Sequence, residues 1–241
     1  MGGFPGIRQL LWSLFKHFFP PACPLCGDTF PIDYSDVFCT DCLAGFKLIP
    51  DAQCSLCSLP FTGTSNSSHF CGRCIQQPPT YAKVYAVGLY DQSLRRAIHQ
   101  FKFNRRVGLD RPLGVLLEQR VDSGLKIDLV VPVPLHRKRL QQRSYNQALL
   151  LAREFARIRK LPMAQNLLLK GHETESQQGL SAKDRVKNLQ GAFNLQGTVR
   201  GKTILLIDDV MTTGATVEAC SRILIDGGAT KIYVAVIGRA A

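Results

Sequence analysis

The chain has 241 residues, 45% of them hydrophobic, which suits a globular protein with one large domain or a medium domain and a small module. Its 30 Lys and Arg against 18 Asp and Glu give a formal net charge of +12, which favours acidic partners such as nucleic acid, phosphorylated ligands or an anionic membrane surface. No run of 18 uncharged apolar residues occurs, so no transmembrane helix is expected.

Residues 1–20 are predicted to form an amphipathic helix. Its apolar face comprises Ile7, Leu10, Leu11, Leu14, Phe15 and Phe18. This face either packs on the protein's own domain or docks on a membrane or a partner protein. Because no small-residue cleavage site follows, we expect a cytoplasmic protein, with peripheral attachment to the inner membrane as an option.

Eight of the nine cysteines form four pairs with two residues between the partners. The pairs are Cys23 and Cys26, Cys39 and Cys42, Cys54 and Cys57, and Cys71 and Cys74. This spacing lets both thiolates reach one tetrahedral ion, and its repetition after about 12–20 residues is typical of zinc sites. A disulfide framework fits less well, because such short spacing strains the bridges. We expect two zinc ions, with the pairs combined either in sequence or interleaved.

Residues 21–77 are predicted to form a small double zinc-ribbon module. Turn residues dominate this segment and periodicity is weak, so metal must replace an apolar core. The sequence "QQPPT" at 76–80 marks the boundary, and residues 80–241 are predicted to form the second domain.

Apolar strands alternate with amphipathic helices after this boundary. We expect strands at 82–90, 127–134, 167–170, 203–209 and 231–238, and helices at 91–103, 108–121, 145–160 and 214–227. The alternation predicts an α/β fold with a mostly parallel sheet flanked by helices. Ligands bind such sheets at the carboxyl ends of the strands.

The stretch "LLIDDVMTTGAT" ends an apolar strand in Asp208 and Asp209 and continues through a turn into a helix. Carboxylates accept hydrogen bonds from sugar hydroxyls, whereas the N–H groups of a helix N-terminus hold phosphate. Gly214 allows a close approach of the backbone, and three hydroxyls add donors, those of Thr212, Thr213 and Thr216. The stretch fits a ribose 5-phosphate and is neither a P-loop nor a dinucleotide fingerprint. The alternative is an ordinary strand, turn and helix with solvated acids.

This stretch closely resembles the phosphoribosyl diphosphate (PRPP) motif of type I phosphoribosyltransferases. Further motifs accompany it in order: "CPLCG", "FCTDC", "CSLCSLP", "CGRC", "LRRAIHQFKF", "PVPLHRKRLQQRSYNQA" and "SQQGLSAKDRVKNLQGAF". Together they are similar to the ComF family of competence proteins, which includes the GntX-like proteins. The resemblance implies a zinc-ribbon module before a type I phosphoribosyltransferase-like domain, and a role in DNA uptake during natural transformation.

The resemblance also implies site residues. The PRPP-binding residues would be Asp208, Asp209, Met211, Thr212, Thr213, Gly214, Ala215 and Thr216, with Mg²⁺ carried on the ligand's oxygens. The pyrophosphate would meet Arg137, Arg139 and Arg143. The loop 171–182, with Thr174, Ser176 and Gln177, stands where the family has its flexible catalytic loop. The family usually has Gly where this chain has Ser144, so the segment 143–146 departs from the family's pattern. No catalytic residue and no acceptor pocket can be identified.

Two basic segments, 91–111 and 136–160, contain interleaved aromatic residues, among them Phe101, Phe103 and Tyr145. A positive groove with aromatic side chains is what single-strand binding without sequence preference requires. The candidate DNA-binding residues are Arg95, Arg96, Lys102, Arg105, Arg106 and Lys138. The alternative is a solvated basic face over buried aromatic side chains.

Three functions remain open at this level. The first is a DNA-uptake protein that binds single-stranded DNA, has a pocket for PRPP or a related ribose phosphate, and works with DNA-import or DNA-processing proteins at the inner membrane. The second is a Mg²⁺-dependent phosphoribosyltransferase acting on an unidentified base. The third is an adaptor that senses PRPP.

Overall fold

The computed structural model describes residues 22–29, 37–61, 69–103, 107–171 and 191–241. The expected helix at 1–20, Arg105, Arg106 and the loop beyond Gly171 lie outside these ranges. Within them, no helix is both long and apolar enough to cross a membrane.

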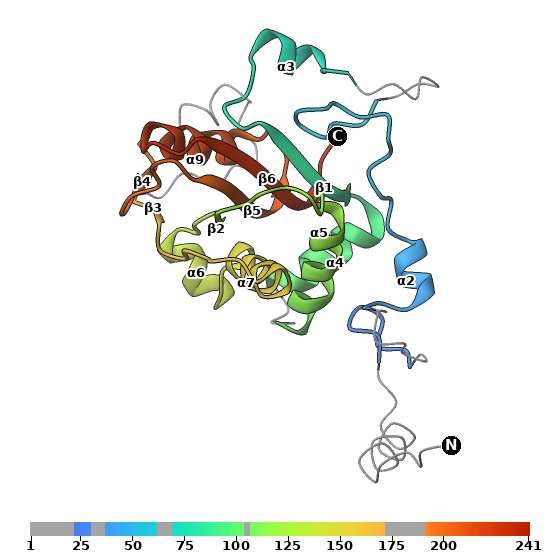
Figure 1. The fold of residues 1–241 in the computed structure, drawn as a ribbon. Helices are drawn as coiled ribbons and strands as arrows, with labels where there is room; N and C mark the ends of the chain where they lie inside the picture. Colours follow the sequence, from blue (N-terminus) through green and yellow to red (C-terminus); the bar gives the residue numbers. More distant parts are fainter. Residues whose placement is uncertain (1–21, 30–36, 62–68, 104–106, 172–190) are drawn as a thin grey trace, which may run out of the picture.

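Four parallel strands form the central sheet in the order β1-β6-β5-β2 (Figure 1). The strands are β1 (Lys83–Leu89), β2 (Leu129–Pro132), β5 (Thr203–Met211) and β6 (Lys231–Arg239). Leu205 of β5 pairs with Tyr233 on one side and Val130 on the other. Both faces of the sheet are covered, which explains why these strands are almost continuously apolar in sequence. The expected α/β fold with a mostly parallel sheet is confirmed.

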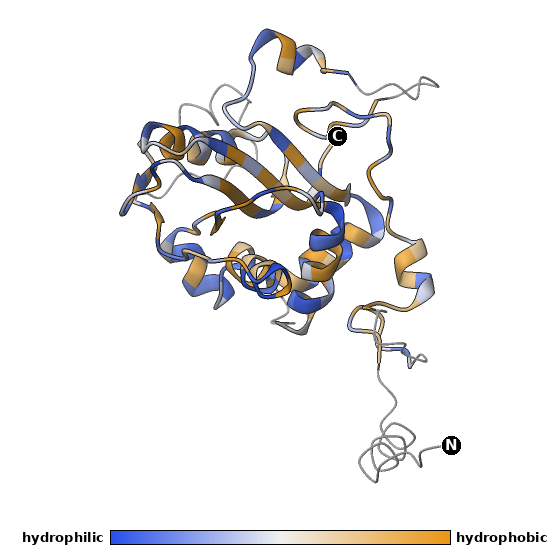
Figure 2. Ribbon diagram, viewed as in Figure 1, coloured by the Kyte–Doolittle hydropathy of each residue, from blue (hydrophilic) through white to orange (hydrophobic). Residues whose placement is uncertain are grey.

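Helices cover the two faces of the sheet unequally. Helix α9 (Ala215–Asp226) covers one face, and the opposite face carries α4 (Gln92–Phe103), α5 (Asp110–Arg120) and α7 (Gln147–Arg159) (Figure 1). Hydropathy follows this arrangement: the strands are mostly apolar, while the helices alternate apolar and polar residues (Figure 2). Each face therefore has a hydrophobic core of its own.

Two segments differ from the sequence expectations. The expected strand at 167–170 forms β3 (Leu168–Lys170), but it pairs antiparallel with β4 (Phe193–Leu195) in a separate small sheet. The segment expected to be a pyrophosphate loop contains the short helix α6 (Arg137–Arg143). Three-residue strands and a helix with little apolar periodicity leave weak signals in a sequence, and both depend on tertiary context.

The cysteine-rich segments contribute two short helices, α2 (Thr40–Ala44) and α3 (Gly72–Gln76). The first cysteine group belongs to the core on the α4, α5 and α7 face, and the second belongs to the core on the α9 face. Backbone hydrogen bonds connect this region to β1, from Leu89 N to Lys47 O at 2.7 Å and from Val84 N to Leu56 O at 2.7 Å. The module therefore packs on the α/β domain at both faces of the sheet.

Candidate functional site

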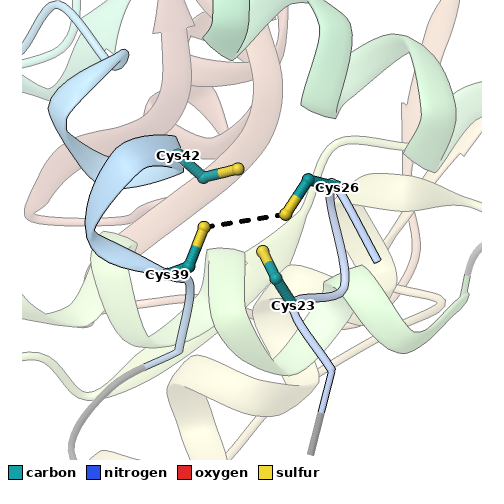
Figure 3. A group of neighbouring side chains, drawn as sticks. All are labelled: Cys23, Cys26, Cys39 and Cys42. Carbon is teal, nitrogen blue, oxygen red and sulfur yellow. Dashed lines mark hydrogen bonds between the residues drawn. The ribbon is translucent and has the colours of Figure 1, made fainter. Parts of the chain in front are cut away.

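The eight paired cysteines form two tetrads that follow the sequential order of the pairs. The first tetrad comprises Cys23, Cys26, Cys39 and Cys42 (Figure 3), and the second comprises Cys54, Cys57, Cys71 and Cys74. Within each tetrad the sulfur atoms all lie within 4.8 Å of one another. The interleaved arrangement left open by the sequence is thereby excluded.

Both tetrads are built in the same way. In each tetrad the first pair of cysteines lies in a tight turn. In the first tetrad Gly27 N closes this turn by donating to Cys23 O at 2.8 Å, and in the second tetrad Ser58 N donates to Cys54 O at 3.0 Å. The second pair lies at the start of a five-residue helix, α2 or α3. This arrangement points backbone N–H groups at sulfur, as when Cys71 N donates to Cys54 Sγ at 3.3 Å.

The geometry of each tetrad fits a zinc ion. A tetrahedron with Zn–S bonds of about 2.3 Å has S–S edges of about 3.8 Å. The distances are 3.6 Å between Cys26 Sγ and Cys39 Sγ (Figure 3) and 3.7 Å between Cys57 Sγ and Cys71 Sγ. When bound, zinc supplies the cross-link that holds such a small module folded.

The thiols within each tetrad differ in their pKa. Although burial opposes it, hydrogen bonding from backbone N–H groups lowers the pKa of Cys23 to about 6 and that of Cys54 to about 7. Burial and the neighbouring thiols raise the pKa of Cys42 and Cys74. Only a positive ion at the centre would ionise all four thiols of a tetrad together.

A cavity of about 240 Å³, here called the Asp208 pocket, opens where β2 and β5 end. Asp208 and Asp209 line it from within β5, which extends to Met211, past the expected end at residue 209. The residues of the turn line it as well: Met211, Thr212, Thr213, Gly214, Ala215 and Thr216. The structure therefore brings the whole acidic and Thr/Gly stretch to one cavity.

Gly214 determines the shape of the turn that leads into α9. It is the residue before the first turn of α9 and has a φ of +81°, in the left-handed region that favours glycine. An added Cβ would also lie 2.5 Å from Met211 Cε. The segment Met211–Thr216, here called the phosphate loop, thus needs glycine at this position.

Lys102 reaches the pocket from the last turn of α4. Its Nζ lies 3.0 Å from Oδ1 of Asp209, and the two side chains are only 14% and 13% exposed. An ion pair this shielded from water is not a weak surface contact. The structure therefore joins a residue expected to bind DNA to a residue expected to bind ribose.

Other cations surround the two carboxylates. Arg139 and Arg143 line the pocket from α6, and Lys170 lines it from the end of β3. Burial lowers the pKa of Arg143 while the charge of Asp209 opposes the shift, and burial also lowers the pKa of Lys170. The pocket thus combines two acids with several bases, which suits a ligand with both hydroxyl and phosphate groups.

Asp208 is the most perturbed acid of the pocket. Burial and the charge of Asp209 raise its pKa to about 7, while Lys102 and Lys170 act against the shift. Asp209 N also donates a hydrogen bond to Asp208 Oδ1 at 2.8 Å. Perturbed carboxyls in a cleft mark candidate functional sites, because folding alone gives no reason to bury them together.

The two polar residues beside α6 have structural roles. His136 precedes α6 and accepts a hydrogen bond from Lys138 N, and Asn146 precedes α7 and accepts one from Ala148 N at 3.0 Å. Asn146 also donates to Val133 O at 3.0 Å. Both side chains therefore cap helices.

The basic face beside the pocket offers one exposed aromatic ring. Phe103 is 55% exposed, His99 lies 4.7 Å from it between ring centroids, and the Arg143 guanidinium lies 5.1 Å from its centroid. By contrast, Phe101 is fully buried and the Tyr145 hydroxyl donates to Phe101 O. Of the three aromatic residues suggested for stacking, only Phe103 is exposed. Arg95 and Arg96 of α4 and Lys138 of α6 are exposed.

The sequence reasoning missed three residues at or beside the pocket. Tyr90 and Lys170 line it, and Arg239 lies behind the phosphate loop. Lys170 immediately precedes the segment expected to be the catalytic loop, and that position was the available signal. Arg239 looked like an ordinary basic residue at a strand end, so only the tertiary structure identifies it.

Comparisons with known proteins agree with this architecture. A double zinc ribbon domain matches residues 14–75, and a phosphoribosyl transferase domain matches residues 143–240. The B. subtilis glutamine phosphoribosylpyrophosphate amidotransferase aligns at 20% identity over 57% of this chain and 30% of that chain, with a TM-score of 0.41. The two domain matches and the tetrads define a protein that joins zinc ribbons to a phosphoribosyltransferase domain.

Two curated relatives narrow this class to a family. Competence protein F of Haemophilus influenzae is 34% identical over 221 residues, which cover 84% of this chain and 96% of that protein. DNA utilization protein YhgH of Escherichia coli K12 is 36% identical over 75% of this chain and 81% of that protein. The chain belongs to the ComF family of competence and DNA-utilization proteins.

Proposed function

We propose that the protein binds single-stranded DNA along α4 and α6 while the Asp208 pocket holds Mg²⁺-bound PRPP or a related ribose phosphate. The observation that carries this proposal is the ion pair between Lys102 and Asp209. Lys102 belongs to the helix that exposes Arg95 and Arg96, and its ammonium group lies inside the pocket. One lysine therefore belongs to both the basic face and the acidic site.

The chemistry of the pocket suits a ribose phosphate. Asp208 and Asp209 would accept hydrogen bonds from ribose hydroxyls, and the N–H groups of the phosphate loop would donate to the 5-phosphate. Arg139 and Arg143 would bind diphosphate oxygens through paired donors. Mg²⁺ would be carried on the ligand's own oxygens, as suits a hard cation that keeps several waters.

Binding of the ribose would change the state of Lys102. Ribose hydroxyls that bond to Asp209 compete with the ammonium group for the same carboxylate oxygens. Displaced Lys102 would then be free to contact a DNA phosphate at the end of α4. We therefore expect Mg²⁺–PRPP to strengthen the binding of single-stranded DNA.

Fluorescence anisotropy of a labelled single strand tests this proposal. The zinc-loaded protein is titrated at several salt concentrations, with and without Mg²⁺–PRPP. On single strands, each contact with a DNA phosphate contributes about −0.7 to the slope of the logarithm of the DNA-binding constant against the logarithm of the salt concentration. Because PRPP should release Lys102 for one further contact, PRPP should steepen this slope by about that amount. In Lys102→Gln this PRPP-dependent change should disappear.

Lys126→Gln is the matched control, because Lys126 is exposed and lies just before β2, at the opposite end of this strand from the pocket. It removes the same charge but should keep the PRPP effect. Failure of the wild-type protein to bind the strand at low salt would overturn the DNA-binding proposal. Binding that PRPP leaves unchanged would overturn the link through Lys102.

A phosphoribosyltransferase reaction is the second candidate, favoured by the domain match over residues 143–240. An acceptor nitrogen would form a bond to the ribose C1 while the bond from C1 to the diphosphate oxygen breaks, and Arg139 and Arg143 would hold the departing diphosphate. Such a site works mainly by positioning and electrostatics. Release of pyrophosphate with one base of a panel would support transfer, and its absence with every base would reject it for that panel.

A further inference from the structure

Arg239 connects the second cysteine tetrad to the phosphate loop. It is the last residue of β6 and is only 4% exposed. Its Nε donates to Cys57 O at 2.9 Å, and its Nη1 donates to Met211 O at 3.2 Å and Thr212 O at 2.6 Å. Nη1 also donates to Ala240 O. A single side chain thus contacts a zinc ligand's backbone and the first two residues of the loop.

The charge of Arg239 needs compensation, because a buried guanidinium without a negative partner is costly. Among the described residues, no carboxylate lies within ion-pair distance of it, and its hydrogen-bond acceptors there are backbone carbonyls. A zinc ion held by four thiolates carries a formal charge of about −2. Arg239 therefore lies between a negative metal centre and a loop suited to a negative phosphate.

The rear of the phosphate loop is open. A cavity of about 790 Å³ is lined by Cys57, Cys71 and Cys74 on one side and by residues 211–215 on the other. Polar links across this cavity add to the packing of Met211 and Ala215 in setting the position of the loop. Besides Arg239, Thr80 provides one, since its N and Oγ1 donate to the Glu218 carboxylate of α9 at 2.9 and 2.6 Å.

We propose that Arg239 is a positioning residue that couples the second zinc centre to the phosphate loop, so that zinc in this tetrad sets the affinity of the Asp208 pocket for ribose phosphate. The effect on the affinity for ribose phosphate rests on the proposed function, whereas the effect of Arg239 on the position of the phosphate loop does not. Coupling is reciprocal in binding free energy, so a bound ribose phosphate should raise the affinity of the second tetrad for zinc by the same factor. The first tetrad packs on the opposite face of the sheet and has no such link among the described residues.

Hydrogen exchange of the loop amides and calorimetric titration with Mg²⁺–PRPP test the coupling on the full chain. Arg239→Gln should still hold two zinc ions, exchange faster across residues 211–216, and bind PRPP between about 5- and 150-fold more weakly. Arg239→Lys should behave similarly, because it keeps the charge but lacks the guanidinium that spans both sites. Loss of the second tetrad by Cys71→Ser with Cys74→Ser should give the same faster exchange.

Arg120→Gln is the matched control, since Arg120 Nε donates to Ala86 O at 3.0 Å in β1, away from the loop. It should leave the exchange of residues 211–216 and the PRPP affinity as in wild type. Loss of the first tetrad by Cys39→Ser with Cys42→Ser should release one zinc without deprotecting the loop.

Two results would overturn the coupling: loop exchange in Arg239→Gln equal to that in Arg120→Gln, or equal deprotection on loss of either tetrad. If the wild-type protein does not bind PRPP, the proposed ligand is wrong, and the exchange measurements still decide the coupling.

Discussion

The buried carboxyl of Asp208 in the pocket lowers the free energy of unfolding when it is ionised. Its carboxyl lies beside that of Asp209, and burial together with this neighbour raises its pKa from 3.8 to about 7. Between about pH 4 and 7 the folded state therefore keeps a proton that the unfolded state has released. Under that condition the free energy of unfolding falls as the pH rises.

Asp208→Asn should consequently stabilise the ligand-free protein at pH 8 and have little effect at pH 4. The amide has no proton to lose, so the cost of the buried charge at high pH disappears. Urea unfolding at pH 4, 6 and 8 measures the difference, with Asp51→Asn as an exposed control for the loss of one charge. A gain in stability that is the same at all three pH values would contradict this explanation.

The contacts of Lys102 and Arg239 could not be predicted from the residues around them in the sequence. The type and spacing of Asp208, Asp209 and Gly214 predicted an acidic pocket beside a phosphate loop, because these signals are local. Lys102 was expected on a DNA-binding surface, and nothing local connects it with Asp209. The same holds for Arg239, whose burial depends on the zinc module packing against the end of β6.

At the scale of elements, α6 is the main departure from expectation. A helix over Arg137–Arg143 replaces the expected open loop, and it still directs Arg139 and Arg143 into the pocket. Ser144 caps the C-terminus of this helix; it has a φ of +68° and donates its N–H to Leu140 O at 2.8 Å. Non-glycine residues adopt this left-handed conformation only at a cost, which fits the glycine that the family resemblance led us to expect here.

Ser144→Gly should therefore raise the free energy of unfolding by about 0.5–1 kcal/mol, because the strain is relieved and the lost side chain is exposed. Lys160→Gly is the comparison, since Lys160 ends α7 with a φ of +53° far from the pocket. Both variants should gain stability in urea unfolding. A loss of stability confined to Ser144→Gly would show that the serine contributes to the fold.

Elements with strong local signals were the ones correctly predicted. The strand and helix that flank the phosphate loop form close to the expected bounds, because an apolar run and an amphipathic helix each have a clear period. Strand β4 was missed, since three residues of Phe193–Leu195 have no period to detect. Its pairing with β3 depends on contacts distant in sequence.

For the whole molecule, the two tetrads pack against opposite faces of one sheet. The cysteine spacing predicted zinc but not the pairing, because a pair can share a metal with either neighbour. Packing settles the order: the first tetrad joins the core of α4, α5 and α7, and the second joins the core of α9. Metal at each position would therefore stabilise a different half of the molecule.

The two centres should differ in how fast they lose zinc. In the first tetrad Cys26 is exposed, whereas every cysteine of the second is at most 8% exposed. The second is also held by Ser58, whose Oγ donates to Val84 O at 2.6 Å, and by Arg239. A chelator attacks through exposed ligands and through local opening, and both routes favour the first centre.

Zinc release to a chromogenic chelator should therefore show two phases of equal amplitude, one zinc ion per chain in each. Cys39→Ser with Cys42→Ser should remove the fast phase and leave the slow one, with the α/β domain still folded by circular dichroism. A single phase with the amplitude of one ion would mean that only one tetrad holds zinc. Loss of the slow phase in this variant would mean that the two centres are not independent, and that the faces of the sheet are stabilised together.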